Sequence, residues 1–487
     1  MYLGGGRVAR DTGESAKLVQ LDRRLSILTL AAALLFLWPL LAYGRPGYIQ
    51  DSAAYYKGGR VAVTFALDKI EPSRTLSTVA QPGANPQLSA AGKVEVRGAR
   101  SVAYSLAAYI FGAPKAQMWL LCAFQAFATG FLSAVTLLVF AGNERRLWRK
   151  LAVLALASPV AFVVCLAIPD IFAGLVILAI TLVATGYDRM STGVRTVTAL
   201  ITTAGIAFHA SHLPIALAMT LTAVGWFAFA AWRRTPVPRL QWAWVITPFV
   251  LGAAATAAFN FVAFGGPSLT GKRYPLTLAR SVAEGPGRWY LEKNCGRLKY
   301  AICEVYPHGP PEEINAFLWG PNGLKQRASP VQMDRIRAEE AEIVLAATRA
   351  YALEELRRVG WSFARQLVRF EPGVGLLDSR IVLDPEGTPQ LEPVHYSRFW
   401  TGIVHWLTIV SVIASVFVLF RRFRADASTR PLIGLIVTGI LVNAAVCVYF
   451  SGIVDRYGAR VIWLLPLLAL ALVGRRPAGE DPIASPA

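Results

Sequence analysis

Long apolar runs separated by short polar segments are the dominant pattern along this chain. The first run, from about Leu25 to Tyr43, contains no charged residue. A helix of roughly 20 apolar residues can cross the hydrocarbon core of a bilayer, so the pattern predicts an all-α polytopic protein with about ten transmembrane helices. The expected spans are 25–43, 116–141, 151–168, a fourth ending near Tyr187, 196–208, a sixth ending before Arg233, 242–264, 399–420, 431–450 and a tenth ending before Arg475.

The charges between these runs predict a topology. Segments 143–150 and 421–424 are rich in Arg and Lys. Cytoplasmic loops carry such an excess, so we expect these segments and both termini in the cytoplasm of a bacterial inner (plasma) membrane. The first run is too long for a signal-peptide core and lacks a clear cleavage site, so it should remain as a helix. Among the short outer turns, only the last contains arginines, Arg456 and Arg460.

Two longer polar segments interrupt the apolar runs. We expect residues 45–100 to form a polar outer loop, in which 61–70 could be an interfacial helix, followed by a short apolar helix over 101–111. Apolar residues recur at helical spacing from Gln332 to Phe370, and Trp361 and Phe363 on this helix could rest one face on the membrane. The expected organisation is a cytoplasmic tail (1–24), a transmembrane module (25–264), an outer, periplasmic domain (265–397), C-terminal transmembrane helices (398–474) and a cytoplasmic tail (475–487).

Composition supports a membrane protein and argues against a nucleic-acid-binding one. Hydrophobic residues make up 55% of the 487 residues and charged residues only 16%. A soluble chain of this length would carry more charge. The formal net charge is +19, but the basic residues stand in short clusters between apolar runs, as membrane topology requires. The partners we expect therefore include membrane lipids and no nucleic acid.

The five cysteines divide into two groups. Cys122, Cys165 and Cys447 fall inside apolar runs, where they are expected to pack as small residues. Cys295 and Cys303 are the two cysteines of the large outer segment. Their close spacing favours one local disulfide in an oxidising compartment, whereas free thiols or a metal-binding pair are the alternatives.

Several charged and polar residues should meet at the outer membrane surface under this topology. They are Asp51, Arg97, Arg100, Asp170, His209, His212, Arg456 and Arg460. Each has a purely structural alternative: Asp170 could cap a helix, the histidines could bind backbone at a helix end, and the arginines could anchor in headgroups. Tyr55 and Tyr56 could offer flat surfaces to a sugar ring, or could be interfacial aromatics.

These residue types suit sugar transfer from a lipid phosphate. A carboxylate can take the proton of an acceptor hydroxyl. Arginine can hold a phosphate with two parallel hydrogen bonds and stabilise the charge that develops on it as it leaves. A donor with a long isoprenoid tail must enter from the bilayer, which favours a site between spans beneath a polar outer domain.

The chain resembles the GT-C glycosyltransferases, polytopic enzymes that use lipid-phosphate sugars, such as the mannosyltransferases and aminoarabinose transferases. The resemblance rests on Gly47-Tyr-Ile-Gln-Asp51 after the first span, the turn Pro169-Asp170, the stretch Arg97-Gly-Ala-Arg100-Ser-Val-Ala-Tyr104 and the ending Asp455-Arg-Tyr-Gly-Ala-Arg460. In that superfamily the third stretch often reads Arg-x-Pro-x-Tyr-Pro, and the prolines are missing here.

The resemblance implies a GT-C-like fold and a polyprenyl-phosphate-linked sugar donor, with a glycan, lipid or protein as the acceptor. Asp51 would be the catalytic base, Asp170 a second acid of the site, and Arg456 or Arg460 a contact to the lipid phosphate. Some relatives need a divalent cation and others do not, so a metal cofactor stays an open alternative.

Three other functions are compatible with the sequence. An O-antigen ligase or polymerase would also use lipid-linked glycans and would rely on His308 or His395 of the large outer segment. A lipid or solute transporter would be expected to place charges at mid-bilayer and to contain inverted repeats, of which the sequence gives no clear sign. A scaffold protein would use the outer domain as an interaction module.

Overall fold

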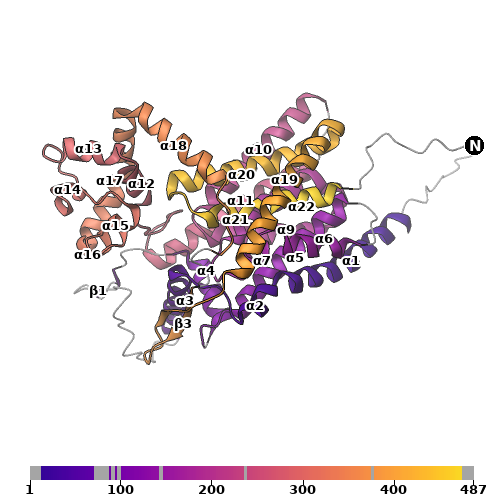
Figure 1. The fold of residues 1–487 in the computed structure, drawn as a ribbon, viewed down its shortest axis with the longest axis horizontal. Coiled ribbons are helices and arrows are strands. Elements are labelled where there is room, and N and C mark those ends of the chain that lie inside the picture. Colours follow the sequence, from indigo (N-terminus) through magenta and orange to yellow (C-terminus); the bar gives the residue numbers. More distant parts are fainter. Residues whose placement is uncertain are drawn as a thin grey trace, which may run out of the picture.

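The structure, a computed structural model, describes residues 12–70, 87–88, 94–95, 100–113, 115–141, 146–234, 239–373 and 378–473. Helices dominate these ranges (Figure 1). In the first half they are α1 (Thr12–Phe36), α2 (Trp38–Tyr43), α3 (Gln50–Ile70), α4 (Val102–Gly112), α5 (Trp119–Phe140), α6 (Leu147–Leu156), α7 (Val160–Val164), α8 (Ile171–Gly186), α9 (Thr192–Phe208), α10 (His212–Trp232) and α11 (Arg239–Phe264).

The second half continues this helical architecture. Its helices are α12 (Leu276–Glu284), α13 (Pro286–Asn294), α14 (Ala301–Val305), α15 (Ile314–Leu318), α16 (Leu324–Arg327), α17 (Pro330–Ala350), α18 (Ala352–Leu367), α19 (Phe399–Ala425), α20 (Arg430–Phe450), α21 (Asp455–Ile462) and α22 (Leu464–Leu472). Single 3-10 turns stand at Tyr187–Arg189 and Ala427–Thr429. The strands form two antiparallel pairs, β1 (Gln87–Leu88) with β2 (Val94–Glu95), and β3 (Ser379–Leu383) with β4 (Pro389–Pro393).

Seven helical segments within the described residues are long and apolar enough to cross a membrane. They are Arg23–Tyr43, Trp119–Phe140, Ile171–Arg189, His212–Trp232, Leu240–Phe264, Phe399–Ala425 and Ala427–Phe450. The expectation of an all-α membrane protein therefore agrees with the structure. The other three expected spans coincide with shorter helices, namely α9, the α6–α7 pair and the α21–α22 pair, so the total of ten stays a prediction.

Prolines stand at both pairs of short helices. Pro159 lies between α6 and α7, and Pro466 lies in the first turn of α22, four residues after Ile462, where α21 ends. Proline has no N–H to donate to the carbonyl four residues earlier, and its ring clashes with that carbonyl. The apolar run of the third expected span is therefore built as two short helices. Helix α21 covers mostly the polar turn expected over 451–460, and α22 covers the tenth apolar run.

The structure corrects the prediction of a polar loop directly after the first span. Residues 50–70 form one helix, α3, whose first turn contains Asp51 and which packs along α4. Gly59 permits this packing, because a side chain there would collide with the Ser105 carbonyl. Glycine is unfavourable inside a helix, so helix propensities alone do not predict α3. The short helix predicted over 101–111 is confirmed as α4.

Helices α12 to α17 share a hydrophobic core of their own, distinct from the core of the spanning helices, and α18 is joined to them through the ion pair of Glu355 with Arg280. Figure 1 shows this group at one side of the molecule, with α18 running toward α20. The helix predicted from Gln332 to Phe370 is present as α17 and α18, which meet at Tyr351. Cys295 and Cys303 lie at disulfide distance, with Cα atoms 5.4 Å apart, so the predicted pairing is confirmed.

The β3–β4 hairpin, which the sequence places in the outer domain, packs against α3. Arg60 of α3 donates hydrogen bonds to the carbonyls of Gly387 and Glu386, at 2.5 and 3.1 Å. The hairpin thus connects the end of the large polar segment to the helix that begins at Asp51. Figure 1 shows β3 beside α3 and away from α12 to α17.

Candidate functional site

Two acids predicted from the sequence, Asp51 and Asp170, lie at the starts of two helices. Asp51 is in the first turn of α3, and Asp170 is the residue that precedes α8. The Asp170 side chain makes no capping hydrogen bond, so it does not serve the alternative role of a helix cap. Its side chain is 4% exposed, whereas that of Asp51 is 19% exposed. One acid of the pair is therefore reachable from outside and the other is enclosed.

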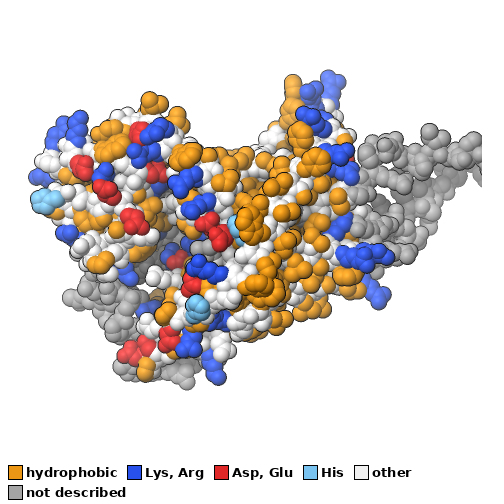
Figure 2. Space-filling model, viewed as in Figure 1, with side chains coloured by type: hydrophobic (Ala, Val, Ile, Leu, Met, Phe, Trp, Pro, Cys, Tyr) orange, Lys and Arg blue, Asp and Glu red, His pale blue; other side chains and the backbone are white. Residues whose placement is uncertain are grey.

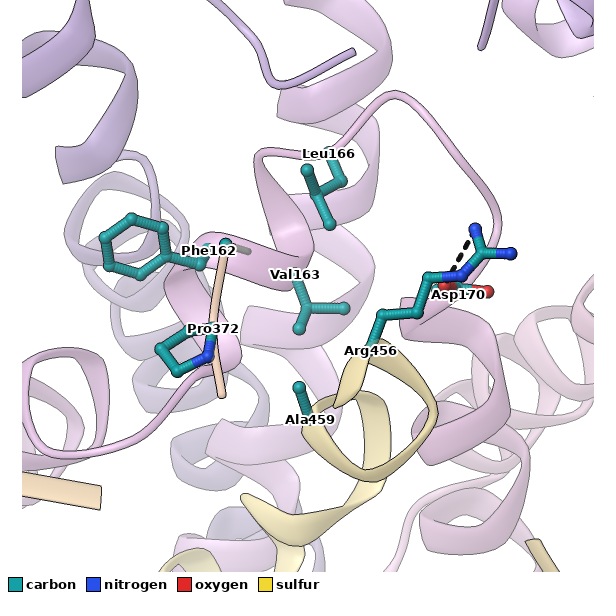
Figure 3. Close-up of a pocket in the computed structure, with 8 residues that line it drawn as sticks. Phe162, Val163, Leu166, Asp170, Pro372, Arg456 and Ala459 are labelled. Atoms are coloured by element: carbon teal, nitrogen blue, oxygen red, sulfur yellow. Dashed lines mark ion pairs between the residues drawn. The ribbon is translucent and has the colours of Figure 1, made fainter. Parts of the chain in front are cut away.

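Arg456 of α21 lies between these two carboxylates. Its Nη1 atom is 3.7 Å from Oδ2 of Asp51 and 3.8 Å from Oδ2 of Asp170. Figure 3 shows the guanidinium beside Asp170, with the ion pair marked. Arg100, next to α4, forms a close ion pair with the other oxygen of Asp51. Residues far apart in the chain thus converge on one charged cluster, as the sequence predicts.

Arg460, one turn beyond Arg456 on α21, is fully buried. Its Nη1 atom is 3.3 Å from Oδ1 of Asp170, and its Nε donates to Oδ1 of Asn443 at 2.9 Å. Its Nη2 donates to the hydroxyl of Ser211 at 3.4 Å. Because residues four apart share a face of a helix, α21 presents both arginines to the acids. This geometry gives a reason for the two arginines in the segment after α20.

Close backbone packing fixes the position of α21. A side chain at Gly174 of α8 would lie 2.6 Å from the carbonyl oxygen of Arg460. That same carbonyl accepts a hydrogen bond from the indole of Trp463 at 2.9 Å. On another side, Gly458 approaches the Arg369 carbonyl so closely that any side chain would collide with it. The two arginines are therefore held on a helix with little freedom to shift.

The cluster carries an excess of positive charge. Arg100, Arg456 and Arg460 face two carboxylates, and arginine is always protonated in proteins. With both carboxylates ionised, one positive charge is left over. Burial weakens screening by solvent, so this charge is felt strongly by an anion that reaches the cluster. The site is suited to a ligand with an anionic group next to a polar one.

His209 and His212 adjoin the cluster, with ring centroids 5.2 Å apart. Nδ1 of His209 lies 2.8 Å from the hydroxyl of Ser211, which also contacts Arg460. Burial, and the nearby His212 and Arg460, hold the pKa of His209 well below its usual range, so the ring is neutral. Nδ1 of His212 is 2.7 Å from the carbonyl of Gly205, as the structural alternative expects.

Two buried polar atoms of the cluster have no hydrogen-bond partner among the residues that the structure describes. They are Oδ2 of Asp170 and Nε2 of His212. Buried polar groups are normally satisfied by protein or ordered water. A cavity lined by Asp170, Arg456 and Phe162 has about 10 Å³ of room for the centre of a water molecule, enough for about one water (Figure 3). This cavity on the Asp170 side has no room for a larger ligand in this conformation, whereas Asp51 and Arg100 are partly exposed.

Other predicted site residues lie differently. Tyr55 and Tyr56 are 1% and 3% exposed and pack on the rings of Tyr104 and Tyr109, so neither offers a free face to a sugar here. Arg97 lies outside the described residues. His308 lines a separate pocket beside Cys295, and His395 is exposed after β4.

Sequence reasoning missed Asn443 and Ser211, which orient Arg460. Asn443 had a detectable signal, because it is an amide inside the apolar run over 431–450. A polar side chain at such a position is expected to have a partner within the bundle. Ser211 lies between the two histidines and gives no comparable signal.

A search of the described residues finds no group of three His, Cys, Asp or Glu side chains that could hold a metal ion. Comparisons with protein families, with curated proteins and with solved structures returned no match. The geometry of the charged cluster is therefore the basis on which a function is proposed.

Proposed function

We propose that the protein is a membrane glycosyltransferase of the GT-C kind that moves a sugar from a polyprenyl-phosphate donor to an acceptor hydroxyl at the outer face of the membrane. The observation that carries this proposal is the position of Arg456, which shares its guanidinium between Asp51 and Asp170. A base and a phosphate-binding group then stand side by side, beside helices long enough to span a bilayer.

Asp51 suits the role of base better than Asp170 does. Its side chain is partly exposed, and both of its oxygens are paired with arginines that a phosphate could attract instead. Entry of a lipid phosphate between Arg100 and Arg456 would release the Asp51 carboxylate, which then accepts a hydrogen bond from the acceptor hydroxyl. Asp170, enclosed and held by Arg460, would keep α21 and its arginines in place.

The transfer step balances with these groups alone. The acceptor oxygen forms a bond to the anomeric carbon of the sugar while the bond between that carbon and the phosphate oxygen breaks. The electron pair of the broken bond leaves with the polyprenyl phosphate, whose new charge the arginines stabilise. The proton of the acceptor hydroxyl passes to the Asp51 carboxylate.

The test is transfer by the purified protein in lipid nanodiscs. The protein is incubated with a panel of polyprenyl-phosphate hexoses and pentoses and with a cell-envelope extract as acceptor, and release of polyprenyl phosphate is followed by mass spectrometry. We expect release with at least one donor and its loss in Asp51→Asn, with unchanged protein yield. Asp188→Asn, which removes an exposed acid outside the cluster, is the matched control and should keep activity.

A transporter of lipid phosphates is the second candidate, and the burial of Arg460 and Asp170 beside spanning helices favours it. The same cluster would then bind polyprenyl phosphate without breaking a bond. Binding of polyprenyl phosphate with no release of sugar from any donor would favour this function over transfer. Absence of both binding and transfer would remove both proposals.

A further inference from the structure

Helix α18 (Ala352–Leu367) has two contrasting faces. Toward the protein it buries the polar side chains of Glu355, Ser362 and Gln366. Toward the outside it exposes apolar side chains at helical spacing. These are Leu353, Leu356 and Trp361, which are 82%, 71% and 66% exposed, and Val368 just beyond the helix. This is the reverse of the pattern of a soluble surface helix, whose apolar face turns inward.

The polar face binds α18 to the end of a candidate membrane span. Glu355 accepts a hydrogen bond from Arg280 at 2.6 Å, and Nε of Arg280 donates to the carbonyl of Tyr449, in the last turn of α20. Gln366 both donates to and accepts from the backbone of Val454, which follows α20. Helix α18 is thereby held beside the end of the candidate span α20.

We infer that the exposed apolar face of α18 lies in the boundary between lipid headgroups and acyl chains, and seats the α12–α18 group on the bilayer. Helix α18 packs on α20, whose apolar side chains Leu441 and Tyr449 are also partly exposed, at 40% and 42%. An amphipathic helix of this kind lies in the plane of the interface, with aromatic and aliphatic side chains inserted.

The charges beside this face select lipid over a protein partner. Helix α18 and the two residues after it carry four arginines and two acids; the arginines are Arg357, Arg358, Arg365 and Arg369. Of the acids, Glu355 is buried and paired with Arg280, and Glu354 is paired with Arg357 and Arg358, so positive charge is in excess. Basic side chains next to an apolar face are attracted by anionic headgroups. Figure 2 shows basic and hydrophobic side chains together over the part of the molecule where Figure 1 draws α18. The inference does not depend on sugar transfer.

A pair of nitroxide labels tests the inference directly. Leu356→Cys places a label on the exposed apolar face of α18, and Gln326→Cys places one at an exposed position of α16, which Figure 1 draws well away from α18. Both labels are measured in the full chain in nanodiscs that contain anionic lipid. The native free cysteines are buried, and the unlabelled parent chain controls for their reaction. Power saturation compares the access of each label to oxygen, which concentrates in lipid, with its access to a water-soluble nickel chelate.

We expect the label at 356 to favour oxygen and the label at 326 to favour the chelate, with oxygen-to-chelate ratios that differ about tenfold or more. A label at 356 that favours the chelate would overturn the inference. Shielding of the label at 356 from the chelate in native membranes but not in nanodiscs would also overturn the inference, because a protein partner would then cover the face. Trp361 gives a second readout: brominated lipid should quench the fluorescence of the native chain more than that of Trp361→Phe.

Discussion

Two arginines of the described residues, Arg280 and Arg460, are completely buried, and they lie in opposite surroundings. Arg280 of α12 donates to Glu284 and to Glu355, each at 2.6 Å, and to a backbone carbonyl at 3.0 Å. Arg460 of α21 has one carboxylate, Asp170, at 3.3 Å, and it shares this acid with Arg456. The first arginine is surrounded by excess negative charge and the second belongs to a cluster with excess positive charge.

This difference in surrounding charge distinguishes an ion cluster that stabilises the fold from a candidate binding site. Around Arg280 the bonds are short and an incoming anion would meet two carboxylates. Around Arg456 and Arg460 the ion pairs are long, and Oδ2 of Asp170 lacks a hydrogen-bond partner among the described residues. A cluster that keeps weak pairs and spare positive charge can exchange partners when an anionic ligand arrives.

The largest predicted effect is on the free energy of unfolding and concerns the ion cluster around Arg280. We expect Arg280→Met to lower the free energy of unfolding by about 3–5 kcal/mol, since it leaves Glu355 and Glu284 without their buried partner. Thermal unfolding of the protein in detergent measures it. Arg357→Met, at a side chain that is 70% exposed, should change stability by less than about 0.5 kcal/mol. Equal losses of stability in the two variants would mean that the ion cluster around Arg280 does not stabilise the fold.

A smaller effect, on binding rather than stability, should follow a change in the site. Arg456→Gln removes the guanidinium shared by Asp51 and Asp170. We expect its affinity for polyprenyl phosphate, measured by native mass spectrometry in nanodiscs, to fall about ten- to a hundredfold, as befits the loss of a charged hydrogen bond. Arg380→Gln, an exposed arginine on β3, is the control. A variant that binds normally but unfolds easily would make Arg456 a structural residue.

The smallest effect concerns pH. His209 is neutral in the folded protein because its pKa is held well below the usual value, whereas in the unfolded chain the pKa is about 6.5. Below that pH the unfolded state binds a proton that the folded state does not, so stability falls as pH falls. One such group contributes at most about 1.4 kcal/mol per pH unit.

The variant His209→Gln should therefore lose less thermal stability than the native chain between about pH 7.5 and 5.5. His395→Gln removes an exposed histidine and should follow the native chain. Equal losses for all three proteins would mean that His209 is not held neutral. The comparison with His395 matters because carboxylates elsewhere also titrate toward low pH.

The sequence was informative where one physical rule acts alone. Apolar runs located the spanning helices, and the alternation of basic and neutral turns put Asp51, Asp170 and Arg460 at one face, where the structure joins them. It failed where tertiary contacts override local preference. The glycine pair 58–59 suggests a loop, yet close packing on α4 makes it part of a helix.

The exposure of individual side chains was also not predictable from the sequence. Tyr55 looks like an interfacial aromatic in the sequence, but its ring is buried against Tyr104. The burial of a single aromatic next to a polar segment depends on which helix covers it, and that is set by contacts between distant parts of the chain. Hydrogen-bond partners such as Asn443 are hidden for the same reason.

The contact at Gly458 joins the helix that carries the charged cluster to the end of α18. The Arg369 carbonyl that presses on this glycine follows α18 directly in the chain, and the glycine stands midway between Arg456 and Arg460. Because α21 is packed this closely at Gly458 and against Gly174, the contact that seats α18 also helps to fix the backbone that carries both guanidinium groups.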